Sequence, residues 1–239
     1  MPAGRADVRG RAPTASGAGT RARLVAVLLR TESRALPWRS PLAAALVGLL
    51  LAAVPWAFAP ELDQGVRLNV LRATALCGAL AAAFLLDDPA RHTTGAVPVP
   101  RPLRQALRVG LVLPVAALWW AAALLLSQRG DAAVRAEGLP YGAVTLEAAT
   151  LCALAVALSA GVVRCTGVCA PGAGVGGAVL ALVVVVMALQ PDGFELFVPL
   201  RDPRWEVAHQ RWAVLLAVAV LGWAGCAPDP VRRLGRRRG

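Results

Sequence analysis

Residues 87–108 read DDPARHTTGAVPVPRPLRQALR and form the most polar break between two long apolar runs of the chain. Asp88 can accept hydrogen bonds from the free amides of a first helical turn, and Pro89 suits the first helical position because no N–H is needed there. Gly95 can end that short helix, and the prolines that follow impose an extended path. Two interpretations stay open: a rigid surface helix that docks a soluble partner, or a solvated loop that begins with a capped turn.

The composition of the chain indicates a membrane protein. Hydrophobic residues make up 57% of its 239 residues, charged residues only 16%, and the mean hydropathy is +0.60. An average soluble protein carries about 25% charged residues. Six apolar segments approach the roughly 20 residues that a helix needs to cross a bilayer. We therefore predict an all-α membrane protein with six transmembrane helices, at 41–60, 68–86, 106–126, 143–163, 172–190 and 211–227.

Four regions follow from this pattern. Residues 1–20 are rich in Gly, Ala and Arg without apolar periodicity, which predicts a disordered basic tail. Residues 21–40 are expected to form an interfacial amphipathic helix, residues 41–227 the six-span transmembrane domain, and residues 228–239 a basic cytoplasmic tail.

The predicted interfacial helix carries one unusual residue. Arg30 and Arg34 fall on one face and leucines on the other, but Glu32 lies within the apolar face. Either Glu32 pairs with an arginine of the polar stretch 87–108, which we call the elbow, or with an arginine of a partner, or the helix breaks near 31–33. The sequence leaves both interpretations open.

The arginines predict the orientation. With a cytoplasmic N-terminus, 18 arginines fall inside and six outside, which satisfies the positive-inside rule. Both termini and the elbow at 87–108 are then cytoplasmic, in a multi-pass protein of a bacterial plasma membrane. The net charge of +11 is concentrated next to the spans, where it can meet anionic lipids. We therefore expect no nucleic-acid partner.

All 25 basic residues are arginines, because the chain contains no lysine. A Walker A loop needs a lysine on the nucleotide phosphates. The chain is therefore not a conventional P-loop ATPase by itself.

Two motifs that resemble cofactor or metal sites have simpler explanations. Residues 172–177 read GAGVGG and match the dinucleotide fingerprint, but that fingerprint requires a preceding strand, and here the glycines open an apolar run. Close helix packing explains them better. Cys165 and Cys169 lie four residues apart without further ligands nearby, so we expect free thiols and no metal.

Two charges lie inside predicted spans, and such charges are functional candidates by default. Arg72 and Glu147 are at similar depth near the outer starts of spans two and four, where they can pair with each other or extend to the surface. A structural role is favoured over a substrate contact. The two histidines, His92 and His209, are predicted on opposite sides of the membrane, so no acid–base pair indicates an enzyme.

The longest outer loop, residues 191–210, mixes apolar and charged residues. This mixture is consistent with a short helix that dips into the outer interface, or with an ordinary extracellular loop.

Taken together, these features resemble the membrane subunits of type-2 ATP-binding-cassette transporters, the ABC permeases of actinobacterial type. The shared features are an amphipathic helix with an acidic residue (21–38, with Glu32), six spans, and an elbow between spans two and three. In the family, that elbow carries a coupling helix followed by a proline-rich lead into span three, which Asp88 to Gly95 and the PVPR of 98–101 resemble. The loop at 191–210 falls where the family has a re-entrant outer region.

The resemblance implies a permease subunit that is not itself an enzyme, with no cofactor of its own and ATP used by a separate ATPase subunit. A second permease chain, identical or a sister subunit, would complete a transporter that is expected to export. The docking surface for the ATPase would consist of two elements, the coupling helix and the interfacial helix. They are represented by Asp88, Pro89, Arg91, His92 and Thr93, and by Arg30, Glu32 and Arg34. The alternative is a non-transporting polytopic membrane scaffold or regulatory protein.

Overall fold

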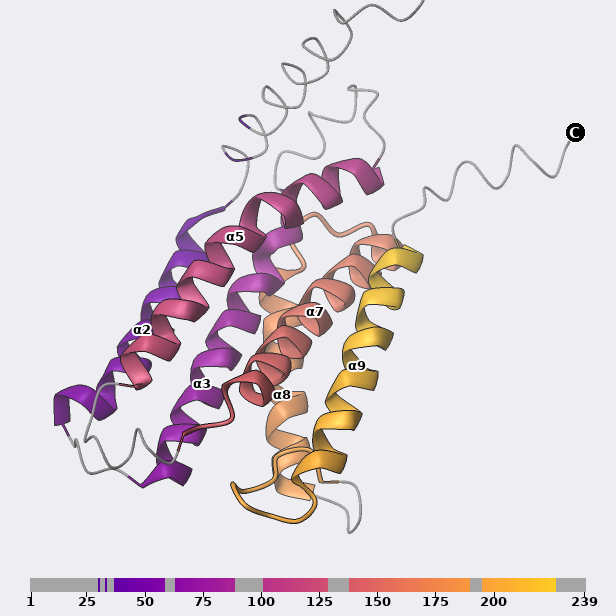
Figure 1. Cartoon of the computed structure of the whole chain (residues 1–239). Helices are drawn as coiled ribbons and strands as arrows, with labels where there is room; N and C mark the ends of the chain where they lie inside the picture. The colour runs from indigo at the N-terminus through magenta and orange to yellow at the C-terminus, as the bar shows by residue number, and fades with distance from the viewer. Residues whose placement is uncertain are drawn as a thin grey trace, which may run out of the picture.

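A computed structural model describes residues 30, 33, 37–58, 63–88, 101–128, 138–189 and 195–226. Within these ranges the regular structure is entirely helical. The helices run lengthwise beside one another and alternate in direction (Figure 1). They are α2 (Arg39–Phe58), α3 (Gln64–Ala83) with its 3-10 extension η1 (Phe84–Leu86), α5 (Arg101–Ser127), α7 (Tyr141–Thr166), α8 (Gly172–Leu189) and α9 (Trp205–Cys226).

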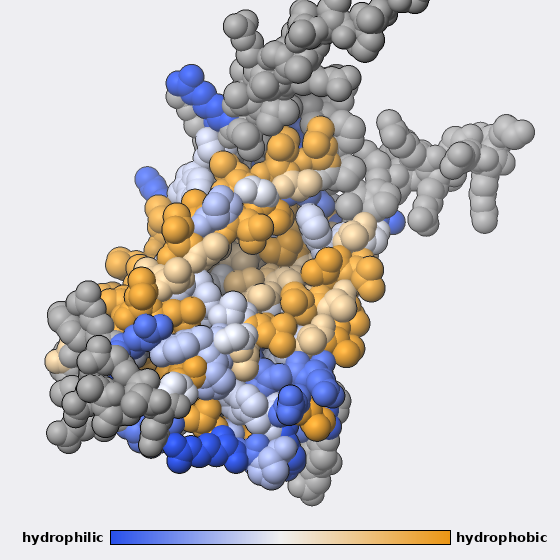
Figure 2. All heavy atoms as spheres, viewed as in Figure 1, coloured by the Kyte–Doolittle hydropathy of each residue, from blue (hydrophilic) through white to orange (hydrophobic). Residues whose placement is uncertain are grey.

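Five of these helices are long and apolar enough to cross a membrane, which indicates a multi-pass membrane protein. They are α3 with η1, α5, α7, α8 and α9. Helix α2 corresponds to the first predicted span, but its apolar part, Arg39–Pro55, is shorter than the others. The all-helical class is thus confirmed, whereas the total of six spans stays a prediction. Figure 2 shows hydrophobic side chains over the middle of the bundle.

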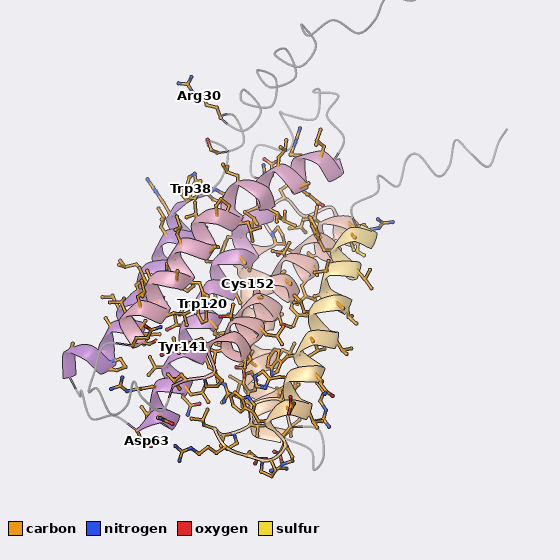
Figure 3. All side chains as sticks on the ribbon, viewed as in Figure 1. Arg30, Trp38, Asp63, Trp120, Tyr141 and Cys152 are labelled. Carbon is orange, nitrogen blue, oxygen red and sulfur yellow. The ribbon has the colours of Figure 1, made fainter. Side chains whose placement is uncertain are left out.

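The bundle has two ends, which we call the site end, after the polar cluster described in the next subsection, and the elbow end. The site end holds Asp63, Tyr141 and the start of α9, and the elbow end holds Trp38, the end of η1 and the start of α8 (Figure 3). Asp63 begins α3 at the site end, where its carboxylate accepts from Gly65 N at 2.9 Å.

Helix α3 lies at the centre of the bundle and touches α2, α5, α7 and α8, while α9 packs on α7. The interface is built from small side chains: Ala75, Ala79 and Ala83 of α3 are buried against Ala148 and Ala155 of α7. In a membrane, helix association depends on close packing, and small residues let two backbones approach. A dense row of alanines therefore explains why α3 and α7 form the core.

A tryptophan of α5 fills a notch between α2 and α3. The indole N–H of Trp119 donates to the Ala45 carbonyl at 2.8 Å. A Cβ on Gly48 would lie 2.6 Å from the Trp119 ring, and one on Gly78 would lie 3.0 Å from it. The two glycines therefore make room for the ring. The next residue, Trp120, donates to Thr145 Oγ1 at 3.0 Å and joins α5 to α7.

The glycine-rich start of α8 is helical and follows a short loop after α7, so the strand that a dinucleotide site needs is replaced by a helix. Gly172 lies against Phe84 of η1, where a Cβ would overlap the ring, and Gly176 lies near Leu80 of α3. Gly174 and Gly177 face open space. Close packing therefore explains Gly172, whereas a Cβ at Gly176 would make only an ordinary contact.

Three helices begin four or more residues before the predicted starts of their spans. Helix α9 begins at Trp205, six residues before 211, α5 at Arg101, five residues before 106, and α3 at Gln64, four residues before 68. Of the predicted interfacial helix up to residue 36, the structure describes only Arg30 and Ser33, both helical, with Ser33 Oγ donating to Arg30 O. The tails 1–20 and 228–239 lie outside the described residues.

We predict that Gly48→Ala destabilises the bundle by about 1–3 kcal/mol, because the added methyl group overlaps a tryptophan ring that a hydrogen bond holds in place. The matched control is Gly110→Ala in α5, where a Cβ meets nothing within 4 Å and helix propensity favours alanine by about 1 kcal/mol. Thermal unfolding of the purified chain in detergent micelles measures both. Equal stability of the two variants would contradict the inference that Gly48 makes room for the Trp119 ring.

Candidate functional site

The centre of the site is a two-pronged ion pair between α3 and α7. Arg72 donates from Nε to Glu147 Oε2 at 2.8 Å and from Nη2 to Glu147 Oε1 at 2.9 Å. Glu147 is 0% exposed. The sequence left open whether these two charges pair or extend to the surface, and the structure shows the pair. An isolated buried carboxylate is very costly in a membrane, so the guanidinium is its essential partner.

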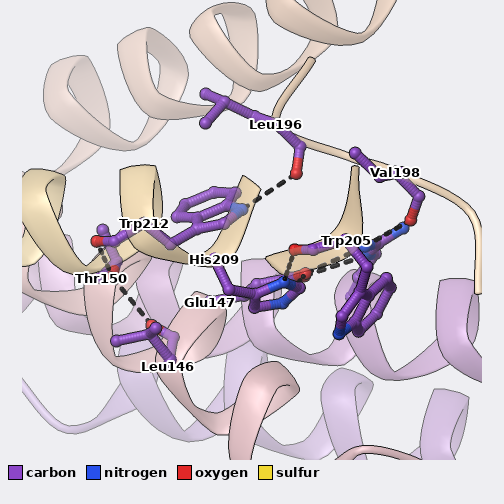
Figure 4. A network of polar contacts seen from close by, with 9 residues as sticks. Leu146, Glu147, Thr150, Leu196, Val198, Trp205, His209 and Trp212 are labelled. Atoms are coloured by element: carbon purple, nitrogen blue, oxygen red, sulfur yellow. Dashed lines mark hydrogen bonds and ion pairs between the residues drawn. The ribbon is translucent and has the colours of Figure 1, made fainter. Parts of the chain in front are cut away.

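His209 of α9 adds a third member, which the sequence analysis missed. Its Nε2 lies 3.2 Å from Glu147 Oε1, and its Nδ1 lies 2.8 Å from the Trp205 carbonyl one turn earlier (Figure 4). A carbonyl oxygen only accepts, so Nδ1 carries a hydrogen. The rings of Trp205 and His209 stack with centroids 4.4 Å apart. The available sequence signal was the spacing Trp205-x-x-x-His209, which places both side chains on one helical face.

The loop before α9 closes over this cluster. Val198 O accepts from Arg72 Nη2 at 3.1 Å. The Arg72 guanidinium lies 5.5 Å from the Phe197 ring centroid and 5.9 Å from that of Trp205, both within cation–π range. Leu196, Phe197 and Val198 are all buried. Of the predicted outer loop 191–210, residues 195–204 form turns whose buried part, 196–198, covers the site end of the bundle, and residues 205–210 belong to α9.

Trp212 fixes that loop to α9 and α9 to α7. Its indole N–H donates to Leu196 O at 3.0 Å (Figure 4), and its ring meets that of Phe197 edge-on, with centroids 5.3 Å apart. Thr150 Oγ1 of α7 lies 3.2 Å from the Trp212 carbonyl and donates to it or to Leu146 O. One turn beyond His209, α9 is thus held to α7 by contacts that carry no charge.

A second buried arginine lies nearby and was misplaced by the sequence analysis. Arg67 directly precedes the predicted start of span two at residue 68 and was counted among the outside arginines, but it lies in the first turn of α3 and is 1% exposed. Its Nη1 donates to Ser127 O at the end of α5, 3.3 Å away. Because α5 ends there, the guanidinium meets a carbonyl that the helix leaves unpaired.

The elbow end has its own polar junction. Asp87 Oδ1 accepts from Gly172 N, the first residue of α8, at 2.8 Å, and the Asp87 carbonyl accepts from Arg108 of α5 at 3.1 Å. Asp88 N donates to Cys169 O at 2.8 Å. Ser159 of α7 donates to Ala83 O at 2.9 Å. Four helices, α3, α5, α7 and α8, therefore meet where the elbow leaves α3.

Asp88 is buried and paired within the chain. Its Oδ2 lies 3.4 Å from Arg108 and 3.7 Å from Arg104 of α5. Its backbone is not helical. The rest of the predicted docking residues, Pro89, Arg91, His92 and Thr93, lie outside the described residues, as do Glu32 and Arg34 of the interfacial helix; Arg30 is exposed.

Burial raises the pKa of the Asp87 carboxyl above its usual value, and the Gly172 N–H and the charge of Arg108 oppose that shift. At the opposite end, hydrogen bonds from Arg204 lower the pKa of the exposed Asp202. No group of three or more His, Cys, Asp or Glu residues that could hold a metal ion occurs in the described part of the chain. Both polar groupings described above consist of ion pairs and hydrogen bonds.

Comparison of the chain with protein-family models, with curated proteins and with solved structures finds no match.

We predict that Glu147→Gln lowers stability by about 3–5 kcal/mol, because Arg72 then stays buried without a counter-charge. Thermal unfolding in detergent micelles measures the change. Glu206→Gln is the matched control, since Glu206 is an exposed acid in the first turn of α9 and its loss should cost less than about 1 kcal/mol. A Glu147→Gln variant as stable as this control would contradict the structural role of the ion pair.

We predict that Asp87→Asn is at least as stable as the native chain at neutral pH, because the amide oxygen still accepts from Gly172 N while the buried charge is removed. Since the folded-state pKa is raised, the cost of the charge is present above that pKa. It disappears as the pH falls toward about 4, the ordinary value for Asp.

The stability advantage of Asp87→Asn should therefore shrink on acidification. Asp87→Leu leaves the Gly172 N–H without its acceptor and should cost about 1–3 kcal/mol at every pH. Unfolding curves between neutral and acidic pH test this, and an advantage of the asparagine variant that grows on acidification would be the opposite of the expected result.

Proposed function

We propose that this chain is the membrane-spanning permease subunit of an ABC-type exporter, which a separate ATPase subunit energises. The proposal joins the resemblance of the sequence to type-2 ABC permeases with the all-helical membrane bundle. The lack of lysine is consistent with it, because ATP hydrolysis would then be supplied by another chain.

The observation that carries the proposal is the junction at the start of the elbow. Asp87 and Asp88 contact the start of α8, the loop before it, and two arginines of α5, while η1 continues directly from α3. A partner that moves the elbow would therefore pull on three long helices at once. Such a junction suits the transfer of movement from a soluble motor, because packed helices shift as units.

The opposite end of the bundle complements this arrangement. There the cluster of Arg72, Glu147 and His209 and the buried turn 196–198 hold α3, α7 and α9 together. In the proposed mechanism, ATP-driven movement enters at the elbow end and the helices rock against the site end. The elbow end and both termini would face the cytoplasm of a bacterium.

A second permease chain, identical or a sister subunit, would complete the complex. Large apolar side chains on α2 and α8 are exposed, so these faces are available to lipid or to that chain. The most exposed examples are Leu42, Leu46 and Leu50 of α2 and Val184 and Leu189 of α8.

The test is to purify the tagged chain from membranes of its own cell and to measure the ATPase subunit and ATP hydrolysis that accompany it. The proposal predicts that a Walker A protein is recovered. Arg91→Glu, within the predicted docking residues, should lower that recovery by more than about tenfold while insertion into the membrane persists, because like charges at an interface cost several kcal/mol.

The matched control is Arg201→Glu, the same charge change at the site end, which should leave recovery unchanged. Recovery of the chain with no nucleotide-binding protein would contradict the proposal and favour a scaffold or regulatory protein of the membrane.

A further inference from the structure

The contact between Glu147 and His209 requires a proton. His209 Nδ1 lies 2.8 Å from the Trp205 carbonyl and must donate to it. In the neutral imidazole the other nitrogen, Nε2, then carries a lone pair. That lone pair faces Glu147 Oε1 at 3.2 Å. Two lone pairs at this distance repel, so the observed geometry fits a state with one proton shared between the imidazole and the carboxyl group.

Burial leaves Nε2 no alternative partner. The atom is buried, and among the described residues it makes no well-aligned hydrogen bond; its 3.2 Å contact with Glu147 is an ion-pair contact. If the proton leaves, nothing described near Nε2 can donate to it. A buried acceptor without a donor is unfavourable, so the imidazole must either keep the proton or move toward water.

Arg72, the other charged group at the cluster, determines that the contact between His209 and Glu147 is the one that breaks. The charged side chains that face the imidazole in the described residues are Glu147 from α7 and Arg72 from α3, while its own helix presents the Trp205 ring. Arg72 already binds both oxygens of Glu147 and the Val198 carbonyl. Loss of the proton therefore leaves the Arg72–Glu147 pair intact, and the repulsion acts on His209 alone.

We propose that Glu147 and His209 form a binding site for one exchangeable proton, and that release of this proton detaches the first turns of α9 from α7. The proton exchanges with the aqueous phase at the site end, where atoms of the His209 side chain other than the buried Nε2 are exposed and the covering loop carries Glu195, Asp202 and Arg204. This inference does not depend on the proposed transport function.

The movement is confined to one end of α9. Trp212 stays hydrogen-bonded to Leu196 O and close to Thr150 of α7, through groups that do not titrate. Residues 205–211 therefore loosen, while the turn 196–198 and the helix beyond Trp212 remain packed. Low pH closes this end of the bundle and high pH opens it.

The experiment measures amide hydrogen exchange of the full chain in lipid nanodiscs at pH 5.5 and pH 8.5, corrected for the intrinsic exchange rate at each pH. Residues 219–226 of the same helix are the internal reference. The His92→Gln background leaves His209 as the single histidine, so its ring nitrogen resonances report the proton directly.

The expected result is that His209 is doubly protonated, or shares its proton with Glu147, at the lower pH and loses it at the higher pH. Protection of residues 205–211 should then fall by at least about tenfold relative to residues 219–226, as expected when one buried charged contact is lost.

Two variants distinguish the effect of the proton site from general fraying at the start of α9. In Glu147→Gln the amide can donate to neutral Nε2, and in His209→Gln nothing titrates, so either variant should abolish the pH dependence of exchange. The native chain alone suffices if a variant does not fold. Unchanged relative protection of residues 205–211 across a pH range in which His209 loses its proton overturns the proposal, as does a singly protonated, neutral His209 beside ionised Glu147 at pH 5.5.

Discussion

A carboxylate that is fully buried between membrane helices must have its charge compensated, and the arrangement of this bundle follows from how Glu147 meets that requirement. Its two oxygens are taken by the fork of Arg72, and one of them also faces His209. These three residues come from α7, α3 and α9, so one charge fixes the relative rotation of three helices. Apolar packing alone would leave that rotation poorly specified, because lipid is as apolar as the helix surfaces.

The two ends of the bundle use different chemistry around the same alanine-rich middle. At the site end, a charge cluster and a buried turn close the bundle over α3, α7 and α9. At the elbow end, Asp87 and Asp88 connect the end of α3 to the starts of α5 and α8 mainly through backbone groups and arginines. A bundle that is held by polar contacts at both ends and by apolar packing between them can rearrange its helices by breaking the contacts at one end at a time.

The sequence alone was sufficient to predict the helices whose apolar runs are long and uninterrupted, because length and hydropathy are local properties. It also indicated Arg72 and Glu147, since charges inside apolar runs are rare. The sequence did not predict the contacts of His209 and Arg67, for a common reason. Both residues lie in the polar opening turns of long apolar helices. Because the hydropathy is low there, a span predicted from apolar length begins too late to include them. Their burial depends on partners 60 or more residues away, which no local pattern encodes.

Asp88 illustrates the same limit at the elbow. The Asp-Pro pair predicts a helix cap, which is a local interaction, whereas the structure pairs Asp88 with Arg104 and Arg108 of the next helix. The arginines at 104 and 108 occupy positions that only the folded α5 brings to the elbow, so no local pattern shows this pairing. The fold class and the importance of the elbow could be predicted, but not the contacts that connect it to the spans.

The most direct test of the central claim is a double-mutant cycle between Arg72→Gln and Glu147→Gln, measured as the free energy of unfolding in detergent micelles. If Glu147 organises the bundle through Arg72, the two substitutions should be strongly non-additive, with a coupling energy of about 2 kcal/mol or more and a double variant no less stable than either single one. Additive effects, with a coupling energy below about 0.5 kcal/mol, would contradict the account.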